Sequence, residues 1–403
     1  MAVSHNKVLV TYGWVRSSYV AVRNLVEHGV DVIVADSNRV GMCQWSKYPT
    51  KCFRYTSHYE DERQFIDDIK RICAEQKVGL ILGSHNETEI LAKYRDEFSE
   101  ELCALLPNVE QCAVFNNKAR SYELARDHGV PVPERIDYQD PAKVAEAVQQ
   151  HGASRVVVKL LLGNSAKGIF YADTPAETQT LVGDLIQEFE LSADRFPQIE
   201  DCVDGDGCGC SSFYWHGQPI ASFCHRRLRE KTQTGGTSTY RESIENEELV
   251  AYSNKLLSEI GWHGFAMVEY KMHPETGQIW FIEVNPRLWG SLHLSVASGF
   301  EFPYLAWLCA SEGPEAAIQY HTSRTKHIGH RARWLLGDLI IAIGQLARGQ
   351  VGKAWTTLFK QPADSFDDWN RSDPGAFAGE LAFYGSSFIR NRSSNPVEKG
   401  MIG

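Results

Sequence analysis

The chain has 403 residues, more than one ordinary hydrophobic core accommodates, so we expect two or three domains. Hydrophobic residues make up 43% of the sequence and charged residues 23%, which is typical of a folded globular protein and excludes wholesale disorder. The net charge of −10 argues against a general nucleic-acid-binding protein, because such proteins carry a basic surplus.

The sequence also lacks the segments that direct a chain to a membrane. The N-terminus (MAVSHNKVLV) has no apolar signal region, and no run of about 20 apolar residues could span a bilayer. Ten cysteines are scattered without a C-x-x-C pair, which favours reduced thiols. We therefore expect a cytoplasmic protein with no membrane partner.

The first elements predict a parallel α/β sheet. Two β-rich runs, Lys7–Thr11 and Val30–Ala35, flank an amphipathic helical pattern, and this order implies a right-handed crossover. A further strand, Val78–Leu82, ends in the polar segment Gly83–Glu87. Residues at that position bind ligands in open α/β sheets, but they also cap helices, and the sequence leaves both readings open.

The middle of the chain predicts a small α+β unit followed by antiparallel strands. A helix over Asn116–Asp127 precedes a proline-rich link, and the strand Arg155–Leu160 runs into the glycine-bearing loop Gly163–Gly168. Antiparallel strands are expected between Pro197 and Glu242, and a hairpin after them. Beyond this hairpin the pattern is largely helical.

We therefore expect three parts in chain order. They are an N-terminal Rossmann-like domain over residues 1–115, a central domain over 116–315 and a helical C-terminal appendage over 316–403. Within the central domain we expect a small lobe over about 116–197 and a larger lobe over about 198–315. The appendage either closes a substrate pocket or builds a homodimer, and the sequence does not separate these two roles.

The sharpest motif is an acidic hairpin. Glu269 lies on one apolar strand, and the return strand carries Glu283-Val284-Asn285-Pro286-Arg287. Glu283 and Asn285 are two residues apart, so they share a face, and strand pairing can place Glu269 beside them. Carboxylate and amide oxygens are hard ligands suited to Mg²⁺ held together with phosphates.

This motif resembles the Mg²⁺–phosphate signature of the ATP-grasp superfamily, which includes biotin carboxylase and D-alanine–D-alanine ligase. The resemblance covers about residues 5–310 and implies the ATP-grasp fold. It implies that Glu269, Glu283 and Asn285 hold one or two Mg²⁺ (or Mn²⁺) ions on ATP. It also implies that Arg287 contacts the transferred phosphate or the acid.

The resemblance extends to the nucleotide site. It implies that Lys118 and Lys159 bind ATP and that the loop containing Gly163, Ser165 and Gly168 covers the triphosphate. The segment joining the two lobes would hold adenine and ribose, through Glu200, Asp201, Val203 and Asp206. Here Glu-Asp-Cys replaces the Gln-Glu-aromatic pattern frequent in the family, and Asp206 is equally explained as a turn residue.

A second motif resembles the carbamoyl-phosphate-synthase-like carboxylate–amine ligases within this superfamily. The run HRRLRE, a following T-G-G turn and Leu288-Trp289-Gly290-Ser291 carry this resemblance. An arginine run before a hydroxyl-rich turn makes an anion cradle. We assign catalytic roles to Arg226 and Arg227 beside Lys159 and Arg287, and candidate substrate contacts to His85, Glu87, Ser238, Thr239, Trp289 and Gly290.

The resemblance thus predicts an ADP-forming ligase that activates a carboxylic acid as an acyl phosphate and couples it to an amine. The implied partners are ATP, Mg²⁺ and two small molecules. Four alternatives stay open: a carboxylase that uses bicarbonate, an enol-phosphorylating variant, an adenylate-forming ligase that releases AMP, and an ATP-binding regulator without turnover.

Overall fold

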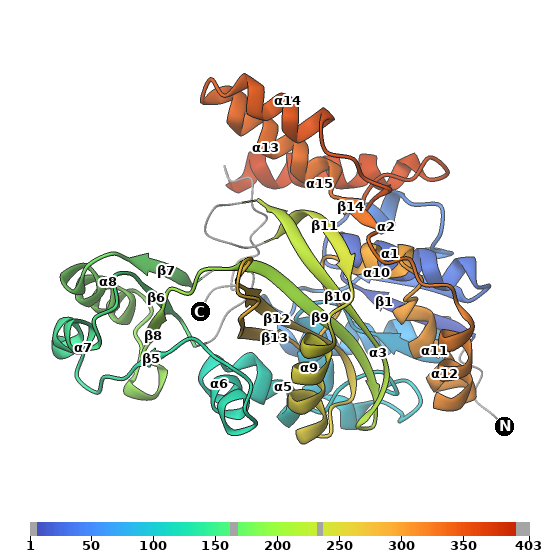
Figure 1. Ribbon diagram of the computed structural model, residues 1–403. Coiled ribbons are helices and arrows are strands. Elements are labelled where there is room, and N and C mark those ends of the chain that lie inside the picture. The colour runs from blue at the N-terminus through green and yellow to red at the C-terminus, as the bar shows by residue number, and fades with distance from the viewer. Residues whose placement is uncertain (1–5, 162–167, 232–236, 392–403) are drawn as a thin grey trace.

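The computed structural model describes residues 6–161, 168–231 and 237–391, and these build three sheets (Figure 1). The N-terminal sheet is parallel with strand order β3-β2-β1-β4, as the β-α-β pattern predicts. Its strands are β1 (Lys7–Thr11), β2 (Asp31–Asp36), β3 (Lys51–Arg54) and β4 (Leu80–Leu82). Its helices are α1 (Arg16–Glu27), α2 (Met42–Trp45), α3 (Glu62–Gln76) and α4 (Glu87–Lys93).

A second, antiparallel sheet forms a lobe that projects at the left of Figure 1. Its order is β5 (Arg135–Ile136), β8 (Gln198–Asp201), β6 (Val156–Lys159) and β7 (Ile169–Ala172). Helices α7 (Val144–His151) and α8 (Pro175–Glu188) share an apolar core with it. We expected the larger lobe to begin at about residue 198, but β8 pairs with β5 and β6 and so lies in the small lobe's sheet.

The third sheet has seven strands in the order β13-β12-β9-β10-β11-β14-β15. They are β9 (Asp206–Trp215), β10 (Gln218–Glu230), β11 (Ser238–Ile244), β12 (Gly264–Met272), β13 (Ile279–Asn285), β14 (Arg331–Arg333) and β15 (Ser365–Phe366). Helices around it include α5 (Val109–Asn116), α6 (Lys118–Asp127), α9 (Glu247–Glu259), α10 (Leu292–Ala297), α11 (Phe302–Glu312) and α12 (Pro314–Ser323).

The C-terminal segment is less separate than its helical pattern suggests. It contains α13 (Leu335–Ala347), α14 (Val351–Phe359) and α15 (Pro374–Asn391), but β14 and β15 extend the large sheet through pairing with β11. The expected helices are present, but we did not predict these two strands from the sequence, because strands of three and two residues are too short for a periodic signal. Among the described residues, no helix is both long and apolar enough to cross a bilayer.

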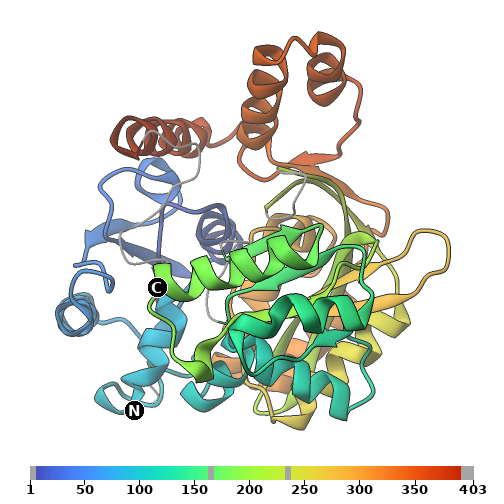
Figure 2. The same ribbon diagram turned by 90° about the vertical axis from the view of Figure 1, so that its left-hand side faces the viewer.

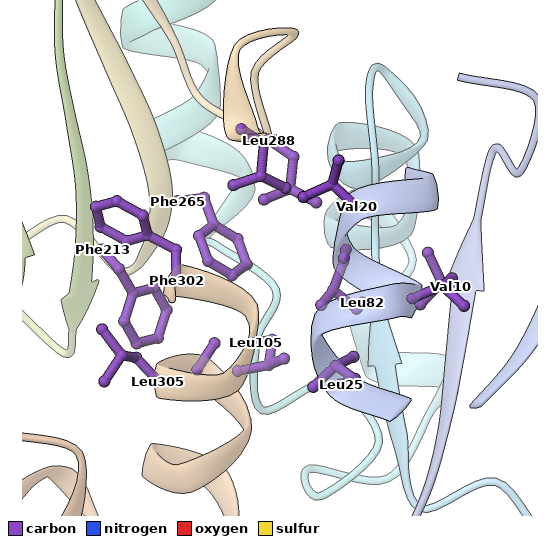
Figure 3. Close-up of a cluster of buried hydrophobic side chains, with 14 of the residues drawn as sticks. Val10, Val20, Leu25, Leu82, Leu105, Phe213, Phe265, Leu288, Phe302 and Leu305 are labelled. Atoms are coloured by element: carbon purple, nitrogen blue, oxygen red, sulfur yellow. The ribbon is translucent and has the colours of Figure 1, made fainter. Parts of the chain in front are cut away.

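One apolar core joins the N-terminal sheet to the large sheet (Figure 3). Side chains of β1, β4 and α1, such as Val10, Leu82 and Val20, belong to the same buried cluster as Phe265 on β12 and Phe302 on α11. Figure 2 views the molecule from the side of the small lobe, which lies in front, and the red C-terminal helices lie at the top in both views. The shared core fixes the N-terminal sheet against the hairpin that carries the acidic motif.

We expect Phe302→Ala to destabilise the protein by about 3–5 kcal/mol, because this side chain is fully buried and its removal leaves a cavity in the shared core. Phe359→Ala is the matched control, since Phe359 is 66% exposed, and its effect should stay within about 0.5 kcal/mol. Urea and thermal denaturation of both variants measure the difference. Equal shifts in the two midpoints would contradict a core role for Phe302.

Candidate active site

The acidic motif occupies neighbouring strands of the large sheet. Glu269 on β12 pairs directly with Glu283 on β13, and Met267 pairs with Asn285, so the hairpin sets all three polar side chains side by side. The Asn285 Nδ2 donates to Glu269 Oε1 at 2.9 Å and to Glu283 Oε1 at 3.4 Å. The predicted juxtaposition is confirmed, and it follows from the antiparallel register.

Two carboxylates this close require positive charge, and the chain supplies it from three elements. Arg227 on β10 forms an ion pair with Glu269, Arg287 Nη2 donates to Asn285 Oδ1 at 2.9 Å, and Lys118 Nζ lies 4.0 Å from Glu283 Oε2. Burial raises the pKa of Glu269, against the opposing effect of Arg227. Burial lowers the pKa of Lys118, although Glu283 opposes that shift. The cluster is a compact, partly desolvated charge network.

The donor atoms of this cluster fit a divalent metal ion. Carboxylate oxygens of Glu269 and Glu283 both lie within hydrogen-bonding range of one amide group, so they converge on a common point. Their side chains keep 15% and 19% exposure, which leaves access from the cavity described below. Hard oxygen donors in this arrangement match the preference of Mg²⁺.

The small lobe contributes a second charged group. Lys159 ends β6 and forms an ion pair with Glu200 on β8, and its Nζ donates to Tyr122 Oη at 2.9 Å. Both charges are almost fully buried. Lys118 begins α6, where the Asn117 side chain caps the helix by accepting from Arg120 N at 3.1 Å. Local capping thus places Lys118 at the helix start, facing the acidic hairpin.

A cavity of about 610 Å³ connects these groups. It extends from the small lobe along the hairpin to the N-terminal domain and the C-terminal helices. Predicted site residues that line it are Lys159, Glu200, Asp201, Val203, Arg227, Ser238, Glu269, Glu283, Asn285, Arg287, Gly290 and His85. The three predicted metal ligands and four of the predicted nucleotide residues, Lys159, Glu200, Asp201 and Val203, therefore line one cavity, whereas Lys118 is not among its lining residues.

Several other predicted residues lie elsewhere. Arg226 points to the opposite side of β10 and pairs with Glu242, Glu87 bonds to Tyr55, and Thr239 accepts from Arg229 Nε at 2.9 Å. Trp289 is buried in the shared core. These four side chains are not among the residues that line the cavity.

The remaining predicted nucleotide residues lie at the start of β9 and in the glycine loop before β7. Asp206 is exposed at the start of β9. Gly168 has a φ of +90°, and its carbonyl accepts from Leu160 N at 2.9 Å, which closes the base of the glycine loop. Gly163 and Ser165 lie outside the described residues.

The structure also adds lining residues that the motifs did not indicate. Glu380 and Tyr384 reach the cavity from α15, and Glu230 and Lys231 reach it from the end of β10. Glu380 is a lone carboxylate within an apolar helical run (GAFAGELAFYG), and that isolation is the sequence signal that could have identified it.

Comparisons with known proteins agree with this geometry. Residues 214–330 match the family described as "ATP-grasp in the biosynthetic pathway with Ter operon". No curated protein matches the chain in sequence.

Solved structures resemble the whole architecture. Pyruvate carboxylase from Rhizobium etli has a TM-score of 0.64 at 17% identity, and the match covers 81% of this chain but 30% of that one. The biotin carboxylase domain of 2-oxoglutarate carboxylase from Hydrogenobacter thermophilus, in complex with MgADP and bicarbonate, has a TM-score of 0.61 at 15% identity and 81% and 73% coverage. L-amino acid ligase from Bacillus licheniformis has a TM-score of 0.60 at 16% identity and 77% and 75% coverage.

These likenesses establish the fold, because at such identities structure is shared more widely than substrate. The architecture is the ATP-grasp fold. This is the fold that the acidic hairpin predicted, and the segment matched by the ATP-grasp family model contains that hairpin.

We expect His225, which lines the cavity, to make the protein less stable in acid. Burial, together with Arg227 and Arg241, lowers the pKa of His225 to about 3 in the folded state. In the unfolded chain a histidine side chain becomes protonated at about pH 6.5. Between about pH 6.5 and 3, His225 therefore carries a proton in the unfolded chain but not in the folded protein, which favours unfolding. Stability present above pH 6.5 is therefore lost as the pH falls, by up to about 1.4 kcal/mol per pH unit.

Urea unfolding from pH 7 to pH 4.5 measures this dependence. His225→Gln should show a shallower loss than the wild type, whereas His327→Gln, which changes an exposed histidine, should follow the wild-type slope. Parallel slopes for all three proteins would contradict a neutral, buried His225.

Proposed function

We propose that the protein is an ATP- and Mg²⁺-dependent ligase that activates a carboxylic acid as an acyl phosphate and joins it to an amine. The observation that carries this proposal is that the Glu269–Glu283–Asn285 cluster shares one cavity with Lys159 and Arg287. The likeness to an L-amino acid ligase and the HRRLRE run support an amine as the second substrate.

In this proposal ATP binds between the small lobe and the large sheet. Lys159 and Lys118 place positive charge beside the phosphates. The end of β8, with Glu200 and Asp201, and Val203 in the segment after it hold the adenine. The Lys271 Nζ donates to the Val203 carbonyl at 2.9 Å, which keeps that segment close to β12. Mg²⁺ held by the acidic hairpin would neutralise charge on the phosphate oxygens.

The reaction then follows from positioning. A carboxylate oxygen of the acid attacks the γ-phosphorus, the bond to the β-phosphate oxygen breaks, and ADP leaves. The Arg287 guanidinium lies next to Asn285 and stabilises the transferring phosphoryl group. The amine nitrogen next attacks the acyl carbon, phosphate leaves, and the nitrogen loses a proton. No protein nucleophile is needed, because alignment and electrostatics lower both barriers.

We expect Glu283→Gln to reduce substrate-dependent ADP formation by roughly 100-fold or more, because it removes one charged ligand from the metal and phosphate site. The assay combines purified protein, ATP, Mg²⁺, a pool of carboxylic acids and a pool of amines, and separates the nucleotide products by chromatography. The matched control is Glu275→Gln, which changes an exposed residue in the turn of the same hairpin and should leave the rate unchanged.

The nucleotide product separates the alternatives. ADP that appears only with both pools supports the ligase. ADP that depends on bicarbonate alone would indicate a carboxylase, and AMP would indicate adenylation. Absence of turnover with any pool would favour an ATP-binding regulator.

Hydroxylamine should intercept the activated acid. It is a small, reactive nucleophile that attacks acyl phosphates, so we expect a hydroxamate to accumulate with ATP, Mg²⁺ and the acid pool in the absence of other amines. Mass spectrometry of the products identifies the acid. ADP formation without hydroxamate would contradict an acyl phosphate and favour the enol-phosphorylating variant.

A further inference from the structure

The C-terminal helices α13 and α14 form a hairpin over residues 335–359, which we call the helical hairpin. It stands out beyond the sheets at the top of both views (Figures 1 and 2). Among the described residues, six large apolar side chains are more than half exposed, and four of them, Ile343, Val351, Trp355 and Phe359, belong to this hairpin. Exposed apolar side chains that gather on one element mark a contact surface.

The exposed apolar residues follow helical spacing. On α14, Val351, Trp355 and Phe359 are four residues apart, so they share one side of the helix. On α13, Ile343 and the half-exposed Leu346 are three residues apart and share a side in the same way. The rings of Trp355 and Phe359 adjoin, with centroids 4.5 Å apart. Each helix thus carries an apolar stripe in addition to the face that it buries.

Buried polar contacts fix the base of the helical hairpin. Arg333 on β14 is buried, and its Nε donates to Asp338 Oδ2 on α13 at 2.6 Å. Its Nη atoms donate to three carbonyl oxygens near the end of α14, those of Thr357, Leu358 and Gln361, at 2.6 to 3.2 Å. Because carbonyl groups at a helix end otherwise lack partners, this arginine holds the second helix in place. The apolar stripes are therefore exposed on an element that is attached to the large sheet.

The charges that accompany these stripes are all of one sign. Between residues 339 and 363 the sequence has Arg348, Lys353 and Lys360 and no aspartate or glutamate, although the whole chain has a net charge of −10. All three basic residues are exposed. The helical hairpin is therefore an apolar and basic surface on a molecule that is otherwise acidic.

This combination fits the surface of an anionic phospholipid membrane. Acyl chains accommodate apolar side chains, tryptophan and phenylalanine favour the headgroup boundary, and lipid phosphates attract lysine and arginine. A second copy of the same surface would instead bring like charges together. Since the hairpin projects from the molecule, it can enter the headgroup layer while the acidic remainder of the protein stays outside.

We propose that the helical hairpin docks the protein on an anionic phospholipid membrane, with Trp355 and Phe359 in the headgroup layer and Arg348, Lys353 and Lys360 on the lipid phosphates. Such a contact needs neither a spanning helix nor a signal region, and the expectation of no membrane partner rested on the lack of both. The proposal is independent of the ligase chemistry, because none of these five residues lines the cavity.

Sedimentation with vesicles tests the proposal on the full chain. Vesicles of phosphatidylcholine alone are compared with vesicles of equal parts phosphatidylcholine and phosphatidylglycerol. We expect at least about ten-fold tighter binding to the anionic vesicles, because each basic residue near such a surface strengthens binding about five-fold, and we expect this preference to weaken as salt is added. The combined variant Arg348→Gln, Lys353→Gln and Lys360→Gln should lose the preference.

A matched pair of tryptophan variants tests the apolar stripe. Trp355→Ser should weaken binding to the anionic vesicles about ten-fold, whereas Trp45→Ser, which changes an equally exposed tryptophan on α2, should bind like the wild type. Trp355→Phe keeps an aromatic ring, so it should still bind but lose the fluorescence quenching caused by lipids brominated on their acyl chains. Circular dichroism checks that every variant is folded.

Three results would overturn the proposal. They are a wild type that binds anionic vesicles no better than neutral ones, a preference that survives in the combined basic variant, and equal binding of the two serine variants. Analytical ultracentrifugation tests the other occupant of this surface. A wild type that binds no vesicles but forms a dimer, together with a monomeric Trp355→Ser, would overturn membrane docking and make the helical hairpin a contact between two copies of the chain.

Discussion

The repulsion between Glu269 and Glu283 is the constraint on which the site depends. Strand pairing forces these two carboxylates together on a hairpin that is otherwise apolar, and the sheet cannot separate them without losing its register. Each therefore needs a cation from another element. Arg227 comes from β10 and Lys118 from the start of α6, so the electrostatic demand of one hairpin ties the centre of the large sheet to a helix beside it.

The same demand explains why charge is nearly balanced along the cavity before any ligand enters. Ion pairs join Arg227 to Glu269 and Glu230, Lys118 to Glu283, and Lys159 to Glu200. Arg287 is linked to the two hairpin carboxylates through Asn285. A metal ion that took over the hairpin carboxylates would release Arg227 and Lys118 from them. Those cations would then be available to phosphate oxygens. The metal ion would thus replace the basic side chains as the partner of the carboxylates, and the phosphates would replace the carboxylates as the partner of the basic side chains.

The sequence predicted the parts of this site that depend on local pattern. The ATP-grasp fold, the parallel N-terminal sheet and the side-by-side placement of Glu269, Glu283 and Asn285 are confirmed, because β-strand alternation and hairpin pairing determine them. The roles assigned to these residues remain predictions. We assigned the same role to two adjacent arginines, and the structure separates them. Arg227 faces the cavity and Arg226 faces away, since consecutive residues on a strand point to opposite sides.

The tail was beyond prediction for a different reason. Nothing near Glu380 in the chain indicates that α15 returns to α2, because the contact depends on Gly375 and Gly379 meeting a turn of the N-terminal domain. In the structure, Glu380, the lone acidic residue of this apolar helix, lines the cavity. The acidic hairpin lies within the matched segment 214–330 and the tail lies outside it. In the proposed ligase, the tail is therefore where the cavity wall can differ without a change to the acidic hairpin. Replacing Glu380 would remove the acceptor that Arg16 and Trp334 share, whereas replacing Glu283 would remove a carboxylate from the charge network of the hairpin.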